Sequence, residues 1–247
     1  MCSGDESAAI LVNEEDHLRL QVLKPGFCLE EAWQQLDAID TKLSGHLDYA
    51  FDQTLGYLTC CPTNVGTGMR ASVMLHLPGL VFSKQITAVI QGVNKLGFAV
   101  RGIFGEGTAN RGNLFQISNQ STLGESEAQI IDHLSAIIRQ LISHEENTRK
   151  MILVRDRYGV MNQVGRAYGL LKHAYKLTLE EALDALSGIR LGADLGMFNS
   201  VSVGLVNELF AKCGTAHLEQ MAGKSLTPAE VEIQRATFFR EKLSGSR

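Results

Sequence analysis

The first half of the chain alternates short apolar runs with longer stretches in which apolar residues recur at helical spacing. The short runs are rich in β-branched residues, and they predict strands over residues 8–12, 18–24, 70–77, 98–104 and 113–119. The longer stretches predict helices over residues 28–45, 83–97 and 125–150. Residues 1–148 therefore have the pattern of one mixed region of strands and helices.

Particular residues mark the expected ends and faces of these helices. Gly45 closes the first helix, where we expect a left-handed cap. Ser83 is the expected N-cap of the second helix, and Gly97 is its expected end. The third helix has an apolar stripe of the width that packs on a core, formed by Ile130, Ile131, Leu134, Ile137, Ile138, Leu141 and Ile142.

The pattern changes after residue 148, where strand signals become few. Residues 177–196, 200–214 and 227–243 resemble helices, with Thr or Ser near their starts and Gly or Pro between them. We therefore expect a helical second domain over residues 149–247.

Composition and charge narrow the classes of protein to consider. The 247 residues are 45% hydrophobic and 20% charged, as in a globular protein of one or two domains. The formal net charge of −4 gives no overall attraction to nucleic acid or anionic lipid. Five cysteines form no CxxC motif, which is typical of free thiols in a reducing cytoplasm. Since no apolar run has the length of a membrane span and no signal peptide is visible, we expect a cytoplasmic protein.

The segment Asn13–His17 (NEEDH) places three acids and a histidine between two predicted strands, and Arg19 follows it. Such charges are costly to bury without partners, so they line a polar cleft or form a surface network. Taken alone, the segment favours the surface network. The alternative is that these charges lie in a sheet that forms the floor of a substrate cleft.

Two more motifs follow NEEDH along the chain: CPTNVGT leading into RAS over residues 61–72, and RGIFGEG over residues 101–107. Together the three motifs resemble the signatures of the ATP:guanido phosphotransferases, the phosphagen kinase superfamily. The resemblance extends over residues 8 to 145. It implies an α+β, guanido kinase-like catalytic domain over residues 1–148, with a mainly antiparallel sheet flanked by helices and followed by the helical C-terminal domain.

Within that superfamily the chain more closely resembles the bacterial protein-arginine kinases, the McsB family. CPTNVGTGMRASVMLHLPGL, RGIFGEG and SNQSTLGESE carry this resemblance, together with the C-terminal helical stretch. It implies transfer of the γ-phosphoryl group of ATP to arginine side chains of proteins, which would mark them for Clp-type degradation or regulate stress repressors. The implied partners are arginine-containing protein substrates, a zinc-binding activator protein, Clp protease components and a second copy in a homodimer, with no nucleic acid and no membrane.

Phosphoryl transfer depends on alignment of the reactants and on cations that stabilise the phosphate oxygens. Arginine suits this task because its fork binds oxygen pairs and keeps its charge. The resemblance assigns the phosphate-binding role to Arg19, Arg70 and Arg101. It also places the nucleotide against the residues that follow the last two arginines: Ala71, Ser72, Val73, Met74, Gly102, Ile103, Phe104, Gly105 and Glu106. We expect Mg²⁺ to be carried on the ATP phosphates, with no dedicated metal ligands in the protein.

A guanidinium acceptor needs a carboxylate that orients it and accepts its proton as the N–P bond forms. The resemblance makes Glu15 this base and Glu106 a second carboxylate that clamps the guanidinium. Cys61 matches the family's reactive cysteine, which we expect to tune substrate position without forming a covalent intermediate. The rest of the first motif is expected to have structural or supporting roles, namely Glu14, Asp16 and His17.

The chain departs from the family at its start. The family's chains begin with a further segment that carries an SSRIR-like arginine pair and a nucleotide-binding histidine, whereas this chain starts immediately before the NEEDH strand. We expect the absence of these cations to impair catalysis by the chain alone, because each phosphate donor contributes strongly to the rate.

A second departure lies near the C-terminus. The family's RDxxRA motif, which forms a phosphoarginine pocket, is VEIQRA here, so Val231 and Glu232 replace the arginine and the aspartate. Arg235 and Ala236 remain. We expect phosphoarginine sensing to be weakened or lost. The alternative is an ordinary amphipathic helix with its two phenylalanines, Phe238 and Phe239, facing inward.

Two other functions remain open at this stage. One is a kinase of free arginine or of another small guanidino compound, and the C-terminal helical extension argues against it. The other is a catalytically impaired fragment that acts as a binding or regulatory module. The missing N-terminal arginines favour this module, and the retention of Glu15, Glu106 and Cys61 argues against it.

Overall fold

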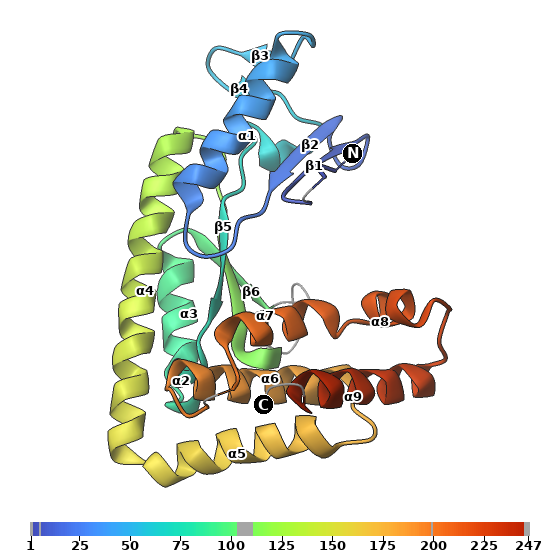
Figure 1. The fold of residues 1–247 in the computed structure, drawn as a ribbon. Coiled ribbons are helices and arrows are strands. Elements are labelled where there is room, and N and C mark those ends of the chain that lie inside the picture. Colours follow the sequence, from blue (N-terminus) through green and yellow to red (C-terminus); the bar gives the residue numbers. More distant parts are fainter. Residues whose placement is uncertain (1, 5, 103–110, 199, 245–247) are drawn as a thin grey trace. The chain divides into compact units, whose positions relative to one another are not determined.

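The computed structural model describes residues 2–4, 6–102, 111–198 and 200–244. The chain divides into two compact units that interleave along the sequence (Figure 1). The first unit comprises Met1–Met74, Ala88–Val100 and Gln116–Ile142. The second unit comprises Leu75–Thr87, Arg101–Phe115 and Ser143–Arg247. Each unit is described by itself below.

Two antiparallel hairpins and a helix build the N-terminal part of the first unit (Figure 1). Strand β1 (Ala8–Val12) pairs with β2 (Leu18–Val22), so that Ile10 lies opposite Leu20. Helix α1 (Leu29–Ser44) packs against β2. The second hairpin pairs β3 (Phe51–Asp52) with β4 (Gly56–Tyr57).

The first hairpin corrects one expectation from the sequence. Asn13–His17 form the turn between β1 and β2, and their charges do not lie in a sheet. The acids and the histidine therefore avoid the cost of burial, because the turn is largely exposed to solvent. The alternative, a sheet floor that carries these charges, is therefore wrong, because the charges lie in a loop.

A three-stranded sheet follows, with strand order β5 (Ser72–His76), β7 (Leu114–Asn119) and β6 (Phe98–Gly102). The Asn119 amide bonds to the Ala71 carbonyl at one end, and the Leu77 amide bonds to the Asn113 carbonyl at the other. β5 and β7 therefore run antiparallel. The α+β fold class with antiparallel strands and helices is confirmed.

In the sequence, helix α3 (Ile86–Lys95) lies between β5 and β6, and helix α4 (Glu127–Arg155) follows β7. The predicted stripe of α4 is confirmed, because five of its members are buried: Ile130, Ile131, Leu134, Ile138 and Leu141. Ile137 and Ile142 are partly buried. α4 continues without a break through residue 149, where we expected the second domain to begin.

The second unit consists mostly of helices (Figure 1). Its helices are α2 (Pro78–Phe82), α5 (Arg157–His173), α6 (Leu179–Asp194), α7 (Val203–Lys212), α8 (Thr215–Ala222) and α9 (Pro228–Ser244). Residues of α5 to α9 form one apolar core. α5 packs against α6 and α9, and α6 packs against α7. Helix α6 starts with a capping box in which Thr178 and Glu181 bond to each other's backbone amides, so its start is fixed by sequence.

Two expected helix ends are wrong. Gly45 has φ −68° and ψ −13°, which is right-handed, so it does not form a left-handed cap. Ser83 is the C-cap of α2, because Pro78 starts that short helix and the chain turns at Lys84 before α3 begins at Ile86. None of the described helices is both long and apolar enough to cross a membrane.

Candidate active site

The NEEDH turn is tied to the loop that contains CPTN by one carboxylate. Oδ1 of Asp16 accepts hydrogen bonds from the amides of Cys60 (2.6 Å) and Cys61 (3.2 Å), and Oδ2 accepts one from Asn64 Nδ2 (2.8 Å). Partial burial raises the pKa of Asp16, but the bonds from Asn64 and from the two amides outweigh it, so its pKa is lowered. Asp16 therefore has the structural role expected for it, and it fixes the position of Glu15 next to it.

Glu15 and Arg19 are both exposed on this hairpin. Arg19 Nη1 lies 2.9 Å from Oε2 of Glu14, and the two side chains are 53% and 48% exposed. Exposed ion pairs contribute little free energy, so Arg19 can exchange this partner for another anion at small cost.

The half-buried Cys61 precedes a short 3₁₀ turn over Pro62–Asn64. Its Sγ lies 3.0 Å from the Thr63 hydroxyl, and its carbonyl accepts a 2.6 Å hydrogen bond from the Thr59 hydroxyl. The thiol is thus oriented by local polar contacts.

Glycines allow the CPTNVGT loop to pass close to its neighbours. Gly66 has φ +116°, and a Cβ there would lie 2.1 Å from the Thr122 carbonyl oxygen. Gly66 also exchanges two main-chain hydrogen bonds with Tyr57, of 2.8 Å and 3.2 Å. The Thr122 hydroxyl donates to the carbonyls of Thr63 (3.1 Å) and Val65 (2.8 Å). A residue other than glycine at position 66 would force this arrangement apart.

Asn119 positions the segment that begins at Arg70. Its Oδ1 accepts the Ala71 amide at 2.8 Å, and its Nδ2 donates to the Met69 carbonyl at 3.0 Å. Earlier in the same strand, β7, Gln116 Nε2 donates to the Ser72 hydroxyl at 3.0 Å. Arg70 and Met74 are exposed, whereas Ala71, Ser72 and Val73 are partly buried.

Sequence reasoning missed Asn119 and Thr122 as positioning residues. Both lie in the SNQST stretch, which carries part of the family resemblance but was given no role. Their polar side chains at the end of an apolar strand were the available signal. Because each bonds to residues about fifty positions earlier, periodicity alone could not assign their partners.

The structure brings together only part of the expected site. Glu15, Arg19, Cys61 and the Arg70–Met74 segment all belong to the first unit. The partly buried Arg101 and the buried Gly102 end β6 and belong to the second unit. Ile103, Phe104, Gly105 and Glu106 lie outside the described residues.

Comparisons with known proteins identify the family. Residues 1–148 match the ATP:guanido phosphotransferase C-terminal catalytic domain, and residues 157–247 match the C-terminal domain of the protein-arginine kinase McsB. The chain is 49% identical to the protein-arginine kinase of Moorella thermoacetica over 241 residues, which cover 98% of this chain and 69% of that protein. The chain belongs to the protein-arginine kinase family. It is also 46% identical to the family member from Halothermothrix orenii, covering 99% of this chain and 70% of that protein.

Solved structures outside the protein-arginine kinases share the fold. The duplicated taurocyamine kinase from Schistosoma mansoni, with bound transition-state analogue components, has a TM-score of 0.53 at 28% identity. Lombricine kinase has a TM-score of 0.50 at 32% identity. The matches cover 59% and 58% of this chain but only 20% and 40% of those chains. The resemblance to the phosphagen kinase superfamily inferred from NEEDH and CPTN is thereby confirmed.

The VEIQRA segment, residues 231–236, lies in α9. Arg235 is buried, and it donates from Nε to the Cys213 carbonyl (2.9 Å) and from Nη1 to the Leu177 carbonyl (2.8 Å). Burial lowers the pKa of Arg235. Phe238 and Phe239 are buried, as expected for an amphipathic helix. Arg235 therefore connects α9 to main-chain carbonyls of the helical core.

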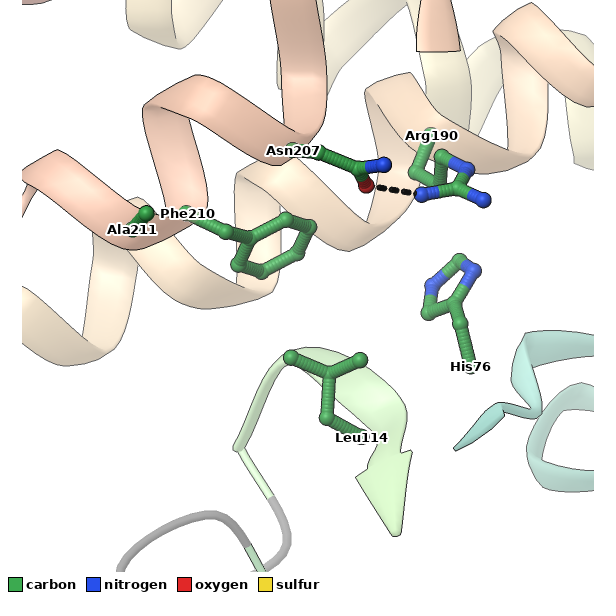
Figure 2. A pocket seen from close by; sticks show the side chains of 6 residues that line it. All are labelled: His76, Leu114, Arg190, Asn207, Phe210 and Ala211. Atoms are coloured by element: carbon green, nitrogen blue, oxygen red, sulfur yellow. Dashed lines mark hydrogen bonds between the residues drawn. The ribbon is translucent and has the colours of Figure 1, made fainter. Parts of the chain in front are cut away.

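The second unit also contains a cavity of about 270 Å³ (Figure 2). Its lining comprises His76, Leu114, Arg190, Asn207, Phe210 and Ala211. Arg190 donates to the Asn207 side chain, and His76 Nε2 lies 2.9 Å from the Ser187 hydroxyl. Burial, together with Arg149 and Arg190, lowers the pKa of His76 to about 3, so the ring is neutral at physiological pH. Among the described residues, no carboxylate of the family motifs lines this cavity.

Proposed function

We propose that this chain transfers the γ-phosphoryl group of ATP to arginine side chains of proteins. The observation that supports this most strongly is the Asp16 connection between the NEEDH turn and the CPTN loop. It holds Glu15 next to the loop that carries Cys61, within the unit that also contains Arg19 and Arg70. Membership of the protein-arginine kinase family supports the same reaction.

The reaction requires a base at the acceptor. As the bond forms between a guanidinium nitrogen and the γ-phosphorus, the bond from that phosphorus to the oxygen of ADP breaks. The proton on the attacking nitrogen passes to the Glu15 carboxylate. Because Glu15 is exposed on a turn, an arginine on a protein surface can reach it. Glu106, outside the described residues, is proposed as the second carboxylate that orients the guanidinium.

Arginines are proposed to hold the phosphates of ATP. Arg19 and Arg70 are exposed, and Arg19 has only a weak exposed partner to give up. The amide of Ala71 is already bonded to Asn119, so contacts from this segment to the nucleotide come from other groups of Arg70–Met74. Arg101 and the residues from Gly102 to Gly105 complete the proposed nucleotide site. Mg²⁺ arrives on the ATP phosphates and reduces their charge.

Cys61 is proposed to position the acceptor. Its thiol is oriented by Thr63 and lies on the loop that Asp16 joins to the turn of Glu15. A thiol beside a guanidinium can bias the position of that group without becoming covalently bonded to it.

The wider family assignments belong to the same proposal. The proposed catalytic part is residues 1–148 and the proposed helical part is residues 149–247. The matched domains over residues 1–148 and 157–247 support this division. The proposed location is the cytoplasm, and the proposed partners are arginine-containing proteins, a zinc-binding activator, Clp protease components and a second copy of the chain. The proposed consequence of phosphorylation is degradation of the marked protein or regulation of a stress repressor.

The test is product analysis under non-acidic conditions, because phosphoarginine is labile to acid. The chain is incubated with Mg-ATP and an arginine-rich protein, and separately with free arginine, and phosphate on arginine is located by mass spectrometry. The proposal expects phosphoarginine in the protein. Replacement Arg70→Ala should lower the rate on the order of a hundredfold. Arg139→Ala, an exposed arginine over the Phe27 ring, is the matched control and should retain the rate.

Other outcomes of the test have defined meanings. Phosphate only on free arginine would contradict the protein substrate and favour a small-molecule kinase such as the structurally similar taurocyamine and lombricine kinases. Absence of transfer from a folded chain to either acceptor would contradict the proposed activity of this chain. That result would favour the regulatory module.

A further inference from the structure

One face of α6 in the second unit makes contacts that the proposed mechanism does not use. This α6 face consists of Glu180, Asp184 and Ser187, whose spacing places them on one side of the helix. All three bond to the short segment Arg111–Asn113, which lies in the same unit. The segment belongs to the matched catalytic domain and α6 to the matched C-terminal domain, so the α6 face joins the two matched domains.

Asp184 holds the main chain of that segment against α6. Its Oδ1 accepts the Gly112 amide at 3.1 Å, and its Oδ2 accepts Nη1 of Arg111 at 3.0 Å. Nη2 of Arg111 donates to Oε2 of Glu180 at 2.9 Å. Gly112 has φ +69°, and a Cβ there would lie 3.2 Å from the Leu183 carbonyl oxygen. The main chain at Gly112 therefore lies directly on α6.

Ser187 joins the end of the segment to strand β5 at a buried point. Its hydroxyl oxygen accepts Nδ2 of Asn113 at 2.7 Å, and Nε2 of His76 lies 2.9 Å from the same oxygen. Asn113 has φ +53°, a left-handed conformation that asparagine adopts more readily than most residues. Its carbonyl accepts the Leu77 amide at 2.9 Å. Ser187 therefore bonds both to the last residue of β5 and to the residue that precedes β7.

The contacts to Arg111 give little net stability. The side chains of Arg111, Asp184 and Glu180 are 37%, 49% and 66% exposed, and exposed ion pairs contribute little free energy. Nε of Arg111 is buried and has no hydrogen-bond partner among the described residues, which costs free energy. The gain and the cost are of similar size. What the contacts do provide is a fixed position for residues 111–113.

The residues that the α6 face holds lie at the ends of the two segments that the proposed function assigns to the reactants. β5 begins within the proposed nucleotide segment Arg70–Met74 and ends at His76. Glu106, the residue proposed to orient the acceptor, lies in the chain between β6 and Arg111. A shift at either held end would therefore move a segment that is proposed to bind a reactant.

We infer that Asp184 and Ser187 are positioning residues for phosphoryl transfer, which act from the C-terminal domain through residues 111–113 and His76. This inference rests on the proposed function for the reaction itself. Neither side chain is assigned a contact with ATP or with the acceptor. A displacement of about 1 Å can lower a rate about a hundredfold even when the changed residue is far from the reacting atoms. Small shifts of the held segments would therefore lower the rate while the chain stays folded.

The first test compares Asp184→Ala with a matched control at equal folded concentration. Because Asp184 is half-exposed, its replacement should leave the chain folded. We expect kcat for an arginine-rich protein to fall about tenfold and KM for ATP to stay within about twofold, because the segment that ends at Arg111 carries the residue that orients the acceptor. Glu241→Ala makes the same change of charge at an exposed position of α9 and should retain both values. Equal kcat for the two variants would overturn the inference.

Further variants test whether Asp184 and Ser187 act through residues 111–113. Arg111→Ala should lower kcat about fivefold, and adding it to Asp184→Ala should lower kcat by less than a further twofold or so, since both changes break the same contact. A loss equal to the product of the two single losses would overturn the inference. Ser187→Ala removes the acceptor of Asn113 and should lower kcat about fivefold or more. An unchanged kcat in Ser187→Ala would overturn the role of Ser187.

Amide hydrogen exchange separates this inference from the proposed function, because it needs no kinase activity. Asp184→Ala should speed exchange of the Gly112 amide about tenfold or more, and Glu241→Ala should leave it unchanged. Unchanged exchange in Asp184→Ala would overturn the inference whether or not the chain is a kinase. If the unaltered chain transfers no phosphate while Asp184→Ala exchanges faster, the proposed function fails and the hold of α6 on residues 111–113 stands. If the chain is active and kcat is equal in Asp184→Ala and Glu241→Ala, the proposed function stands and the inference fails.

Discussion

One carboxylate and one arginine in each unit show two opposite uses of the same charged residue types. In the first unit, Glu15 and Arg19 are exposed on a hairpin, and main-chain amides hold the neighbouring Asp16. In the second unit, the Glu145 and Arg149 side chains are only 4% and 15% exposed. A charged side chain can act on a substrate only if its hydrogen-bonding groups are not all occupied by other parts of the protein. Exposure and weak partners therefore distinguish the candidate catalytic groups from structural ones.

Glu145 is a charge of the second unit whose two oxygens are both occupied by hydrogen bonds within the protein. Its two oxygens accept the amides of Gly79 (2.8 Å) and Leu80 (2.9 Å), and one also accepts Nε of Arg149 (2.6 Å). Arg149 also donates to Asp194 (2.8 Å) and to the His76 carbonyl (3.0 Å). Removal of Glu145 would leave the two amides and Nε of Arg149 buried without their acceptor.

The largest effect on stability is expected for Glu145→Ala. The change removes the acceptor of two buried amides and of Arg149 Nε, so the free energy of unfolding should fall by about 3–5 kcal/mol. Denaturant titration followed by circular dichroism measures this quantity. Glu146→Ala, at the next and exposed position of α4, is the control and should shift it by about 0.5 kcal/mol or less. Similar small effects for both variants would remove the contrast between the units.

The next largest effect is expected at Gly66. Gly66→Ala places a Cβ against the Thr122 carbonyl oxygen in a backbone conformation that side chains rarely adopt, so it should cost about 2–3 kcal/mol. Gly68→Ala tests the backbone conformation alone, because Gly68 has φ +62° but its Cβ would meet nothing closer than 3.8 Å. It should cost about 1 kcal/mol. Equal unfolding free energies for the two variants would show that the close approach of the loops is unimportant.

These contacts also show what sequence could and could not predict. NEEDH, CPTNVGT and RAS identified the family and the candidate residues, because the residue types and the order of these motifs match the signatures of the family. The same residues could not reveal that NEEDH forms a turn, since charges between two strands fit a turn and a cleft floor equally well. Pairings such as Asp16 with Cys60, or Gly66 with Thr122, join distant positions and leave no periodic signal.

The helices teach a similar lesson. The stripe of α4 was readable because five isoleucines and leucines are buried on one face. Helix α5 was not assigned, because only Val160, Val164 and Leu171 are buried in it and Tyr158 is 84% exposed. Helix α8 was not assigned separately because it has only 8 residues. Local pattern fails where few side chains of a helix are buried or the helix is short.

A smaller and pH-dependent effect is expected for Asp16. Because the pKa of folded Asp16 is lowered, its stabilising contribution is complete above its unfolded pKa of about 3.9 and is lost as the pH falls through the folded value. Asp16→Ala should therefore lower the free energy of unfolding by about 1 kcal/mol at pH 7 and by less at pH 3. Denaturant titrations at both pH values measure the difference. A difference that grows toward pH 3 would contradict the assignment.

The smallest effect is expected for Glu14, the exposed partner of Arg19. Glu14→Gln should change the free energy of unfolding by about 0.5 kcal/mol or less, because both side chains remain in water. It should also leave the affinity for ATP equal or higher, since Arg19 becomes easier to recruit. Equilibrium binding of ATP measures this. A large loss of ATP affinity would mean that Glu14 holds Arg19 in its working position.

The contrast between exposed working charges and buried structural ones is tested most directly by the phosphoryl-transfer rate of Glu15→Gln. The rate to an arginine-rich protein is compared with that of the unchanged chain, at equal folded concentration. The account predicts a loss of a hundredfold or more, because a general base contributes roughly 10²–10⁴ to a rate. It also predicts that the free energy of unfolding of Glu15→Gln lies within about 0.5 kcal/mol of that of the unchanged chain. An unchanged phosphoryl-transfer rate in Glu15→Gln would contradict the assignment of Glu15 as the base. A loss of rate that is explained by a matching loss of folded protein would contradict it as well.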